Sequence, residues 1–275
     1  MANRHQRRLL ARAARLRCIA CEKTGQPKSK EHIWPLWLIE RCKADKRGIR
    51  WVGPERINPK SITIPLCRTC NNRLGAELEQ PVSQIFERLE AGAGIKDSEA
   101  ALLVCWLWKF EGLFWSINHP MAQQMIYSDR WTLIDRVLGG AAIQDLRRDL
   151  TLAIGFVHKN DQGFQDWPMG IDSGYSDMNA IFVSGVFGRT AIMVSLSQFA
   201  GLIPNWFGIY QLKPEAAPEE GPCFFPPVCF PTASDAVSIT IGCSRALLEA
   251  HEAKARRDDD AQMFKIARPR IEIPG

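Results

Sequence analysis

Two Cys-x-x-Cys knuckles constrain this chain more than any other feature. The first is Cys18–Cys21 and the second is Cys67–Cys70. Two such knuckles can supply four thiolates to one tetrahedral zinc ion. Cys21 and Cys67 are 46 positions apart, which is too far for a compact zinc ribbon, so a further segment must be inserted between the knuckles. The only histidine of that insertion is His32, and the composition therefore predicts a structural zinc and a separate reactive site.

The order of the motifs resembles a known family of nucleases. A Cys-x-x-Cys knuckle comes first, an acidic-His-hydrophobic-x-Pro box follows, and a second knuckle runs directly into asparagine. This order is similar to the HNH (ββα-metal) endonucleases, in the subgroup that carries a structural zinc held by four cysteines. The matching residues are Cys18, Cys21, Glu31, His32, Pro35, Cys67, Cys70 and Asn71. The resemblance covers roughly residues 15–80.

The resemblance implies a role for each matching position. His32 falls on the general base that activates water, and Glu31 and Asn71 fall on ligands of a catalytic Mg²⁺ or Mn²⁺ ion. The four cysteines fall on the ligands of Zn²⁺. The family's middle asparagine is absent, because Ser61–Thr63 occupies that region, and Asn58 is the nearest residue that could replace it. As a lone residue, His32 would be read as a core histidine or a zinc ligand; within this constellation we favour catalysis.

Composition indicates a soluble globular protein in a reducing compartment. Of the 275 residues, 46% are apolar and 24% are charged. Five of the nine cysteines lie outside the knuckles at unrelated spacings, which favours reduced thiols over a disulfide framework. The N-terminus is rich in arginine and lacks the apolar block of a signal peptide. We therefore expect a cytoplasmic protein. The EHIWPLWL box and the CRTCNN knuckle also resemble those of bacterial proteins, and this resemblance implies a bacterial origin.

Positive charge is concentrated in the first part of the chain. Residues 1–80 contain 18 Lys and Arg against 7 Asp and Glu, although the whole chain has a net charge of only +5. Because basic contacts to phosphate release counterions, this asymmetry favours a nucleic-acid partner over a merely solvated surface. We expect DNA, with RNA as a second candidate, and no membrane partner. The residues expected to contact it are Arg7, Arg8, Arg12, Arg15, Lys46 and Arg47.

The pattern along the chain predicts an α+β protein of two domains. Residues 1–92 should form a zinc-stabilised, treble-clef-like ββα-metal module with a basic N-terminal arm. Residues 93–275 should form a helical and then β-rich α+β domain of unknown role. We expect helices near residues 3–17, 35–43, 71–80, 97–117, 128–138 and 244–257, and strands near 61–66, 150–158, 180–187 and 190–199. The glutamates at 79, 87 and 90 should face solvent. The uncharged stretch 190–212 should be buried sheet rather than a membrane span.

Three functions remain open from the sequence. The first is a metal-dependent endonuclease that hydrolyses phosphodiester bonds in DNA. The second is a non-catalytic zinc module that binds nucleic acid with the same knuckles. The third makes residues 93–275 the main functional unit, as a sensor or partner-binding element that gates the nuclease. The sequence does not specify the DNA target, the ligand of the second domain or the oligomeric state.

Overall fold

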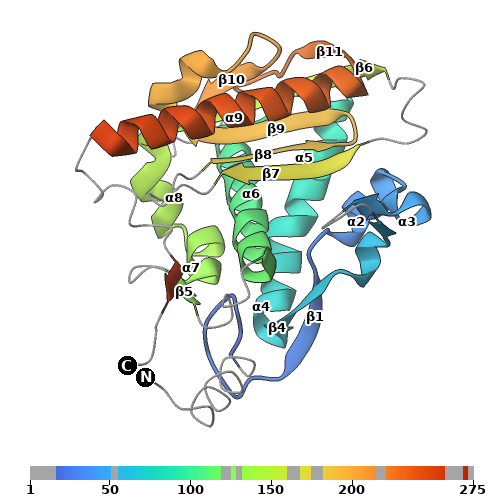
Figure 1. The fold of residues 1–275 in the computed structure, drawn as a ribbon, viewed down its shortest axis with the longest axis vertical. Helices are drawn as coiled ribbons and strands as arrows, with labels where there is room; N and C mark the ends of the chain where they lie inside the picture. Colours follow the sequence, from blue (N-terminus) through green and yellow to red (C-terminus); the bar gives the residue numbers. More distant parts are fainter. Residues whose placement is uncertain are drawn as a thin grey trace.

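A six-stranded sheet with helices on both faces forms the larger part of the protein (Figure 1). The structure is a computed structural model, and it describes residues 17–50, 55–118, 125–127, 132–159, 168–174, 182–214, 221–257 and 269–271. The strands of the sheet are β6 (Leu150–Lys159), β7 (Met169–Gly174), β8 (Phe182–Phe187), β9 (Thr190–Leu196), β10 (Gly208–Gln211) and β11 (Val228–Thr232). The α+β class and the strands predicted after residue 150 are confirmed.

The sheet is antiparallel except at one strand. Its order is β10-β6-β9-β8-β7, and β11 pairs in parallel with the second half of β6. Strand β9 is buried along its whole length, as expected of an uncharged strand covered on both faces. β7 forms the edge of the sheet, since within the described residues it pairs with β8 alone.

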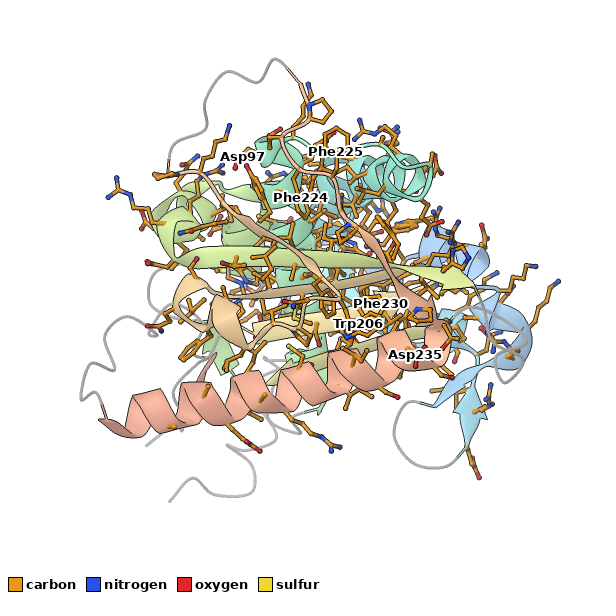
Figure 2. All side chains as sticks on the ribbon, turned by 90° about the horizontal axis from the view of Figure 1, so that it is seen from above. Asp97, Trp206, Phe224, Phe225, Phe230 and Asp235 are labelled. Carbon is orange, nitrogen blue, oxygen red and sulfur yellow. The ribbon has the colours of Figure 1, made fainter. Side chains whose placement is uncertain are left out.

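The long C-terminal helix α9 (Ala233–Arg257) covers one face of the sheet (Figure 1). It begins well before the predicted position because of a reciprocal cap. The Asp235 amide donates to Thr232 Oγ1 at 3.1 Å, and the Thr232 amide donates to Asp235 Oδ2 at 3.1 Å. Next to this start, the rings of Trp206 and Phe230 stack with their centroids 6.1 Å apart (Figure 2).

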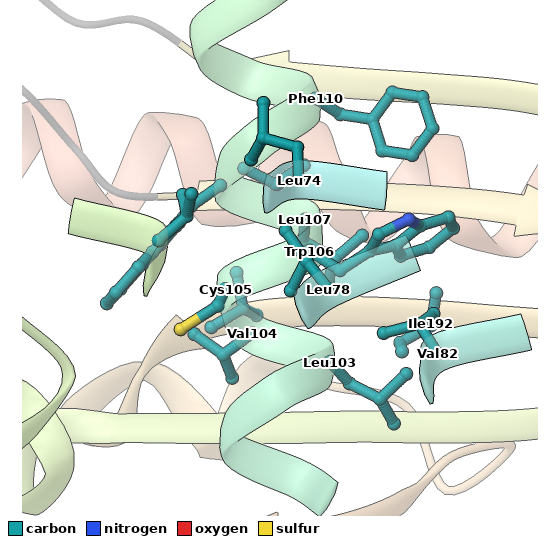
Figure 3. Close-up of a cluster of buried hydrophobic side chains, with 14 of the residues drawn as sticks. Leu74, Leu78, Val82, Leu103, Val104, Cys105, Trp106, Leu107, Phe110 and Ile192 are labelled. Atoms are coloured by element: carbon teal, nitrogen blue, oxygen red, sulfur yellow. The ribbon is translucent and has the colours of Figure 1, made fainter. Parts of the chain in front are cut away.

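Helix α6 (Asp97–Asn118) supports the opposite face of the sheet and was predicted as a buried helix. Trp106 and Phe110 lie in a core that also contains Ile192 of β9, and Leu78 and Val82 of the neighbouring helix enter the same core (Figure 3). At the start of α6, Asp97 is buried and accepts hydrogen bonds from Tyr210 Oη at 2.8 Å and the Lys213 amide at 3.0 Å. This network ties α6 to the β10 side of the sheet (Figure 2).

The first part of the chain forms two antiparallel strands followed by a helix. Strand β1 (Lys28–His32) pairs with β4 (Thr63–Cys67), and α4 (Arg68–Arg73) follows β4 directly. Pro65 lies in β4, which among the described strands pairs with β1 alone, so the missing amide of proline is tolerated there. The insertion between the strands contains α2 (Leu36–Arg41), α3 (Ala44–Arg47), β2 (Ile49–Arg50), β3 (Arg56–Ile57) and η1 (Pro59–Ser61).

One continuous helical path runs from α4 to α5 (Gln80–Glu90). Between them lies a π-helical segment, η2 (Leu74–Glu79), directly before Pro81. Proline has no amide to donate to the preceding turn, and a π segment is one way to absorb this loss without ending the helix. Around Pro81 the helix therefore changes pitch and does not end.

The remaining elements connect these layers. They are β5 (Met125–Tyr127), α7 (Leu133–Leu138), α8 (Ala141–Leu146), η4 (Arg147–Asp149), η5 (Ser197–Leu202) and β12 (Pro269–Ile271). α7 packs beside α6, and β12 pairs with β5 near the end of the chain. In the stretch 190–212, β9 is buried sheet as predicted, whereas η5 is a 3-10 helix without buried residues and β10 is partly exposed. None of the described helices is long and apolar enough to cross a membrane.

Candidate metal centre and catalytic site

The two knuckles come together at one end of the β1–β4 pair. Cys18 and Cys21 lie in the loop before β1, Cys67 ends β4, and Cys70 lies in the first turn of α4. Their four Sγ atoms all lie within 4.8 Å of one another, and three of the four residues are buried. The four cysteines therefore form a group that could hold a metal ion such as zinc.

The sulfur geometry fits a tetrahedral zinc site. A Zn–S distance of about 2.3 Å places two ligands of a tetrahedron about 3.8 Å apart. The Sγ atoms of Cys21 and Cys67 are 3.9 Å apart. Backbone amides also point at the sulfur atoms, since the Cys67 amide donates to Cys18 Sγ at 3.2 Å and the Cys70 amide donates to Cys67 Sγ at 3.4 Å. Such amide donors stabilise thiolate charge.

The pKa values of the knuckle thiols show which of them ionise with difficulty unless a cation is bound. Burial opposes ionisation of Cys18, but backbone hydrogen bonds outweigh it and leave the pKa of Cys18 below its ordinary value. Burial raises the pKa of Cys70, and the neighbouring sulfur atoms raise it further. Burial likewise raises the pKa of Cys21. Closely packed thiolates repel one another, so a bound cation would release protons from this group.

The strand register places His32 away from the cysteine group. Lys28 pairs with Cys67 at one end of β1, and His32 pairs with Thr63 at the other end. At about 3.4 Å per residue, the two ends are separated by roughly 13 Å. A metal ion at the cysteines would therefore hold the hairpin together without contacting His32.

Glu31 lies in a buried ion-pair cluster. Its Oε1 atom accepts from the ammonium group of Lys109 on α6, and the same ammonium group also contacts Glu79 Oε1 from η2. The side chain of Lys109 is only 1% exposed. Burial alone would lower the pKa of Lys109, but the two carboxylates outweigh it and raise that pKa. Burial raises the pKa of Glu31, which Lys109 opposes.

The expected solvent exposure of Glu79 is therefore wrong, and the sequence analysis did not recognise Lys109. The signal was present in the sequence. α6 is apolar nearly all round, and a charged residue inside such a helix must find a partner. Glu111, also on α6, follows the same rule and pairs with buried Arg136. Glu90 also has a partner, Arg41 on α2.

Asn71 contacts β1 from the first turns of α4. Its Nδ2 atom donates to Ser29 Oγ at 2.9 Å and to the Lys30 carbonyl at 3.4 Å. Both hydrogen bonds that the Asn71 side chain makes with described residues use its Nδ2 atom. Its Oδ1 atom is therefore available to a cation. Since side chains alternate along a strand, Ser29 and Glu31 share one face of β1. Asn71 thus lies on the Glu31 side of the strand.

His32 is half-buried at the end of β1, on the face opposite to Glu31. Within the described residues, no hydrogen bond or ion pair joins His32 to Glu31 or Asn71. The Oδ1 atom of Asn58 accepts a hydrogen bond from the Lys60 amide at 2.9 Å and caps η1. Among the described residues, no hydrogen bond joins Asn58 to His32. The structure therefore brings Asn71 toward the Glu31 face and leaves His32 directed away from both.

The predicted nucleic-acid contacts are only partly covered by the structure. Arg7, Arg8, Arg12 and Arg15 lie outside the described residues. Lys46 is exposed at the end of α3. Arg47, next to it, is half-buried and lines a cleft between α3 and the edge of the sheet.

Comparison with known proteins adds no relative. No family model matches the chain, no curated protein matches it, and no solved structure matches it. The function is therefore inferred from the residues of the site alone.

Proposed function

We propose that this protein is a metal-dependent endonuclease of the HNH type that hydrolyses phosphodiester bonds in DNA. The observation that carries the proposal is the two-strand-plus-helix unit β1–β4–α4, which is closed by the four-cysteine group and carries Glu31, His32 and Asn71. In this proposal Zn²⁺ at the cysteines is structural, because four thiolates leave no open coordination position.

The face of β1 that points toward α4 supports a separate cation site. Glu31 contributes a carboxylate and Asn71 an amide oxygen, the hard ligands that Mg²⁺ and Mn²⁺ prefer. Lys109 engages Oε1 of Glu31, so the second carboxylate oxygen is the one proposed to bind the cation. A cation held there would stabilise the negative charge that develops on the phosphate during cleavage.

Lys109 has a positioning role in this proposal. Its ammonium group sits between Glu31 and Glu79, and so it fixes the Glu31 carboxylate against the buried end of α6. It also offsets part of the negative charge of the two carboxylates. The π segment η2 is the element that carries Glu79 into this cluster.

His32 is the proposed general base. His32 is the last residue of β1, so the proposal requires its imidazole to reach, around the end of the strand, the water next to the phosphate that the cation holds; His32 itself would not bind the cation. The surface at this end of the strand would carry the DNA, together with the basic residues Lys46 and Arg47 and the N-terminal arginines. His32 would accept the proton from water as the new P–O bond forms, and the leaving oxygen would take the electron pair of the broken P–O bond and then a proton from solvent.

A non-catalytic zinc module that binds nucleic acid is the second candidate. Two observations favour this second candidate. Glu31 is engaged by Lys109, and no hydrogen bond from the described residues orients His32. In this alternative the same basic surface binds DNA and no bond is broken. The two candidates differ in one measurable respect, which is cleavage that depends on His32.

The test is a plasmid-cleavage assay with Mg²⁺ or Mn²⁺ in parallel with a DNA-binding assay. His32→Ala should slow cleavage by about 10²- to 10⁴-fold and leave affinity for DNA nearly constant, because general-base assistance acts on the chemical step. The matched control is His158→Ala, which removes an exposed histidine from β6 and should cleave like the wild type. If the wild type binds DNA but cleaves no nucleic acid with any divalent cation, the second candidate is correct.

A further inference from the structure

A cleft of about 950 Å³ lies between the insertion of the N-terminal module and the sheet. One wall is formed by α3, β2 and β3, and another by the edge strand β7 with β8. Helix α9 forms a third wall through Val237, Thr240 and Ile241, and through Arg245 and Leu248 further along. Figure 1 shows α2 and α3 on the side of the sheet where β7 forms the edge. The volume is in the range of small-molecule sites.

Three guanidinium groups converge on this cleft from separate elements. Arg47 comes from α3, Arg56 from β3 and Arg245 from α9, and no aspartate or glutamate is among the described lining residues. Arg47 and Arg56 line the same cleft, and burial together with the positive charge of Arg56 lowers the pKa of Arg47. An anion bound among them would relieve this repulsion. Guanidinium groups are well suited to phosphate, since their planar donors can bind it in pairs.

Apart from Ser184 and Thr240, the remaining lining residues are apolar or glycine, and open space lies beside one of the glycines. Met169, Val186, Val237 and Ile241 are among the lining residues. Gly170 of β7 pairs with Val186, which belongs to the core on the α9 side of the sheet. A Cβ atom at Gly170 would meet no atom within 4 Å, so there is open space at this point. A glycine inside a strand can mark a bulge, a bend or a place where a ligand or another backbone approaches closely, and the open space beside Gly170 fits the approach of a ligand.

We propose that this cleft binds an aromatic organic phosphate of nucleotide size. The phosphoryl group lies among Arg47, Arg56 and Arg245, and the ring lies over Gly170 between β7 and α9. None of Glu31, His32, Asn71 and the four cysteines lines the cleft, so it is separate from the proposed nuclease centre, although it shares Arg47 with the proposed DNA surface. The cleft lies between the N-terminal insertion and the sheet, so a ligand bound there would contact both parts of the chain.

The test is fluorescence anisotropy of N-methylanthraniloyl-AMP added to the full-length, zinc-loaded protein. We expect saturable binding that excess inorganic phosphate weakens, and much weaker binding of N-methylanthraniloyl-adenosine, which lacks the phosphate. Arg245→Gln should weaken binding by about tenfold, as expected for the loss of one charge-assisted contact. The matched control is Arg148→Gln, which removes the same charge from an exposed position outside the cleft, and it should bind like the wild type.

A second variant tests the apolar half of the site. Gly170→Phe places a ring in the open space over β7 without a clash at Cβ, so it should fold normally and abolish binding of the probe. No saturable binding of N-methylanthraniloyl-AMP by wild-type protein would overturn the proposal. Equal affinity of the wild type, Arg245→Gln and Gly170→Phe would do so as well. Binding of a DNA duplex that Arg245→Gln weakens, with no binding of the nucleotide probe, would assign the cleft to nucleic acid instead. None of these outcomes depends on cleavage activity.

Discussion

At the scale of single residues, burial separates the cysteines into groups of different reactivity. Burial raises the pKa of Cys42 and of Cys105 to about 12, and that of Cys243 to about 11. Cys223 is exposed at the surface. Because the thiolate is the reactive form, the three buried thiols should be inert at neutral pH. Cys42, Cys105 and Cys243 are free and buried, and the expectation of reduced thiols remains a prediction.

Alkylation with iodoacetamide at pH 8, followed by mass spectrometry, tests this order. In the native zinc-loaded protein Cys223 should react first, while Cys42, Cys105 and Cys243 should react only in denaturant. A raised pKa means that less thiolate is present at a given pH, so the reaction of Cys243 should accelerate only as the pH approaches 11. Equal rates for Cys223 and Cys105 in the native state would contradict the buried positions described here.

At the scale of elements, the sequence predicted regular structure better than its contacts. The long apolar run of α6 and the apolar runs of β6 and β9 are strong signals of buried elements, and each element was found. The start of α9 was missed although its Thr-x-x-Asp cap is visible in the sequence. The spacing of the two cysteine knuckles predicted that their four sulfur atoms come together, and they do. By contrast, the pairing of Glu31 with Lys109 joins positions 78 residues apart, and no local pattern encodes which partner a buried charge will find.

The variant Lys109→Met tests the buried cluster that links β1, η2 and α6. Removing the ammonium group leaves Glu31 and Glu79 without their shared counter-ion, which typically costs about 3–5 kcal/mol. For a chain of this size we expect the Tm to fall by about 10 °C in a thermal melt at pH 7. Because burial already raises the pKa of Glu31, the loss should shrink as the pH falls and the carboxylate becomes protonated.

The matched control is Lys213→Met, since the side chain at that position is exposed. It should melt within about 1 °C of the wild type, because surface substitutions rarely change stability by more than about 0.5 kcal/mol. If both variants melt like the wild type, the ion-pair cluster does not contribute to stability, and the positioning role given to Lys109 is lost with it.

At the scale of the whole molecule, the core continues across the predicted domain boundary. Trp34 lies two residues after His32. Its ring centroid is 5.3 Å from that of Phe110 on α6 and 6.4 Å from that of Phe187 on β8. Cys18, Cys67 and Cys70 belong to the same buried cluster as Trp106 and Leu152. The division at residues 92 and 93 remains a prediction, and the continuity of the core indicates that the two parts unfold together.

Removal of the metal tests this coupling. Cys67→Ser should lower the zinc content of the purified protein, and the loss of a ligand should destabilise the β1–β4–α4 unit. Because α4 continues through η2 into α5, whose residues pack on α6, the sheet should lose stability as well. Calorimetry should show one unfolding transition in the wild type and one at lower temperature in Cys67→Ser. Cys223→Ser, which changes an exposed cysteine outside the group, should retain zinc and the wild-type transition. Two separate transitions, with only the first sensitive to Cys67→Ser, would show instead that residues 1–92 fold as an independent domain.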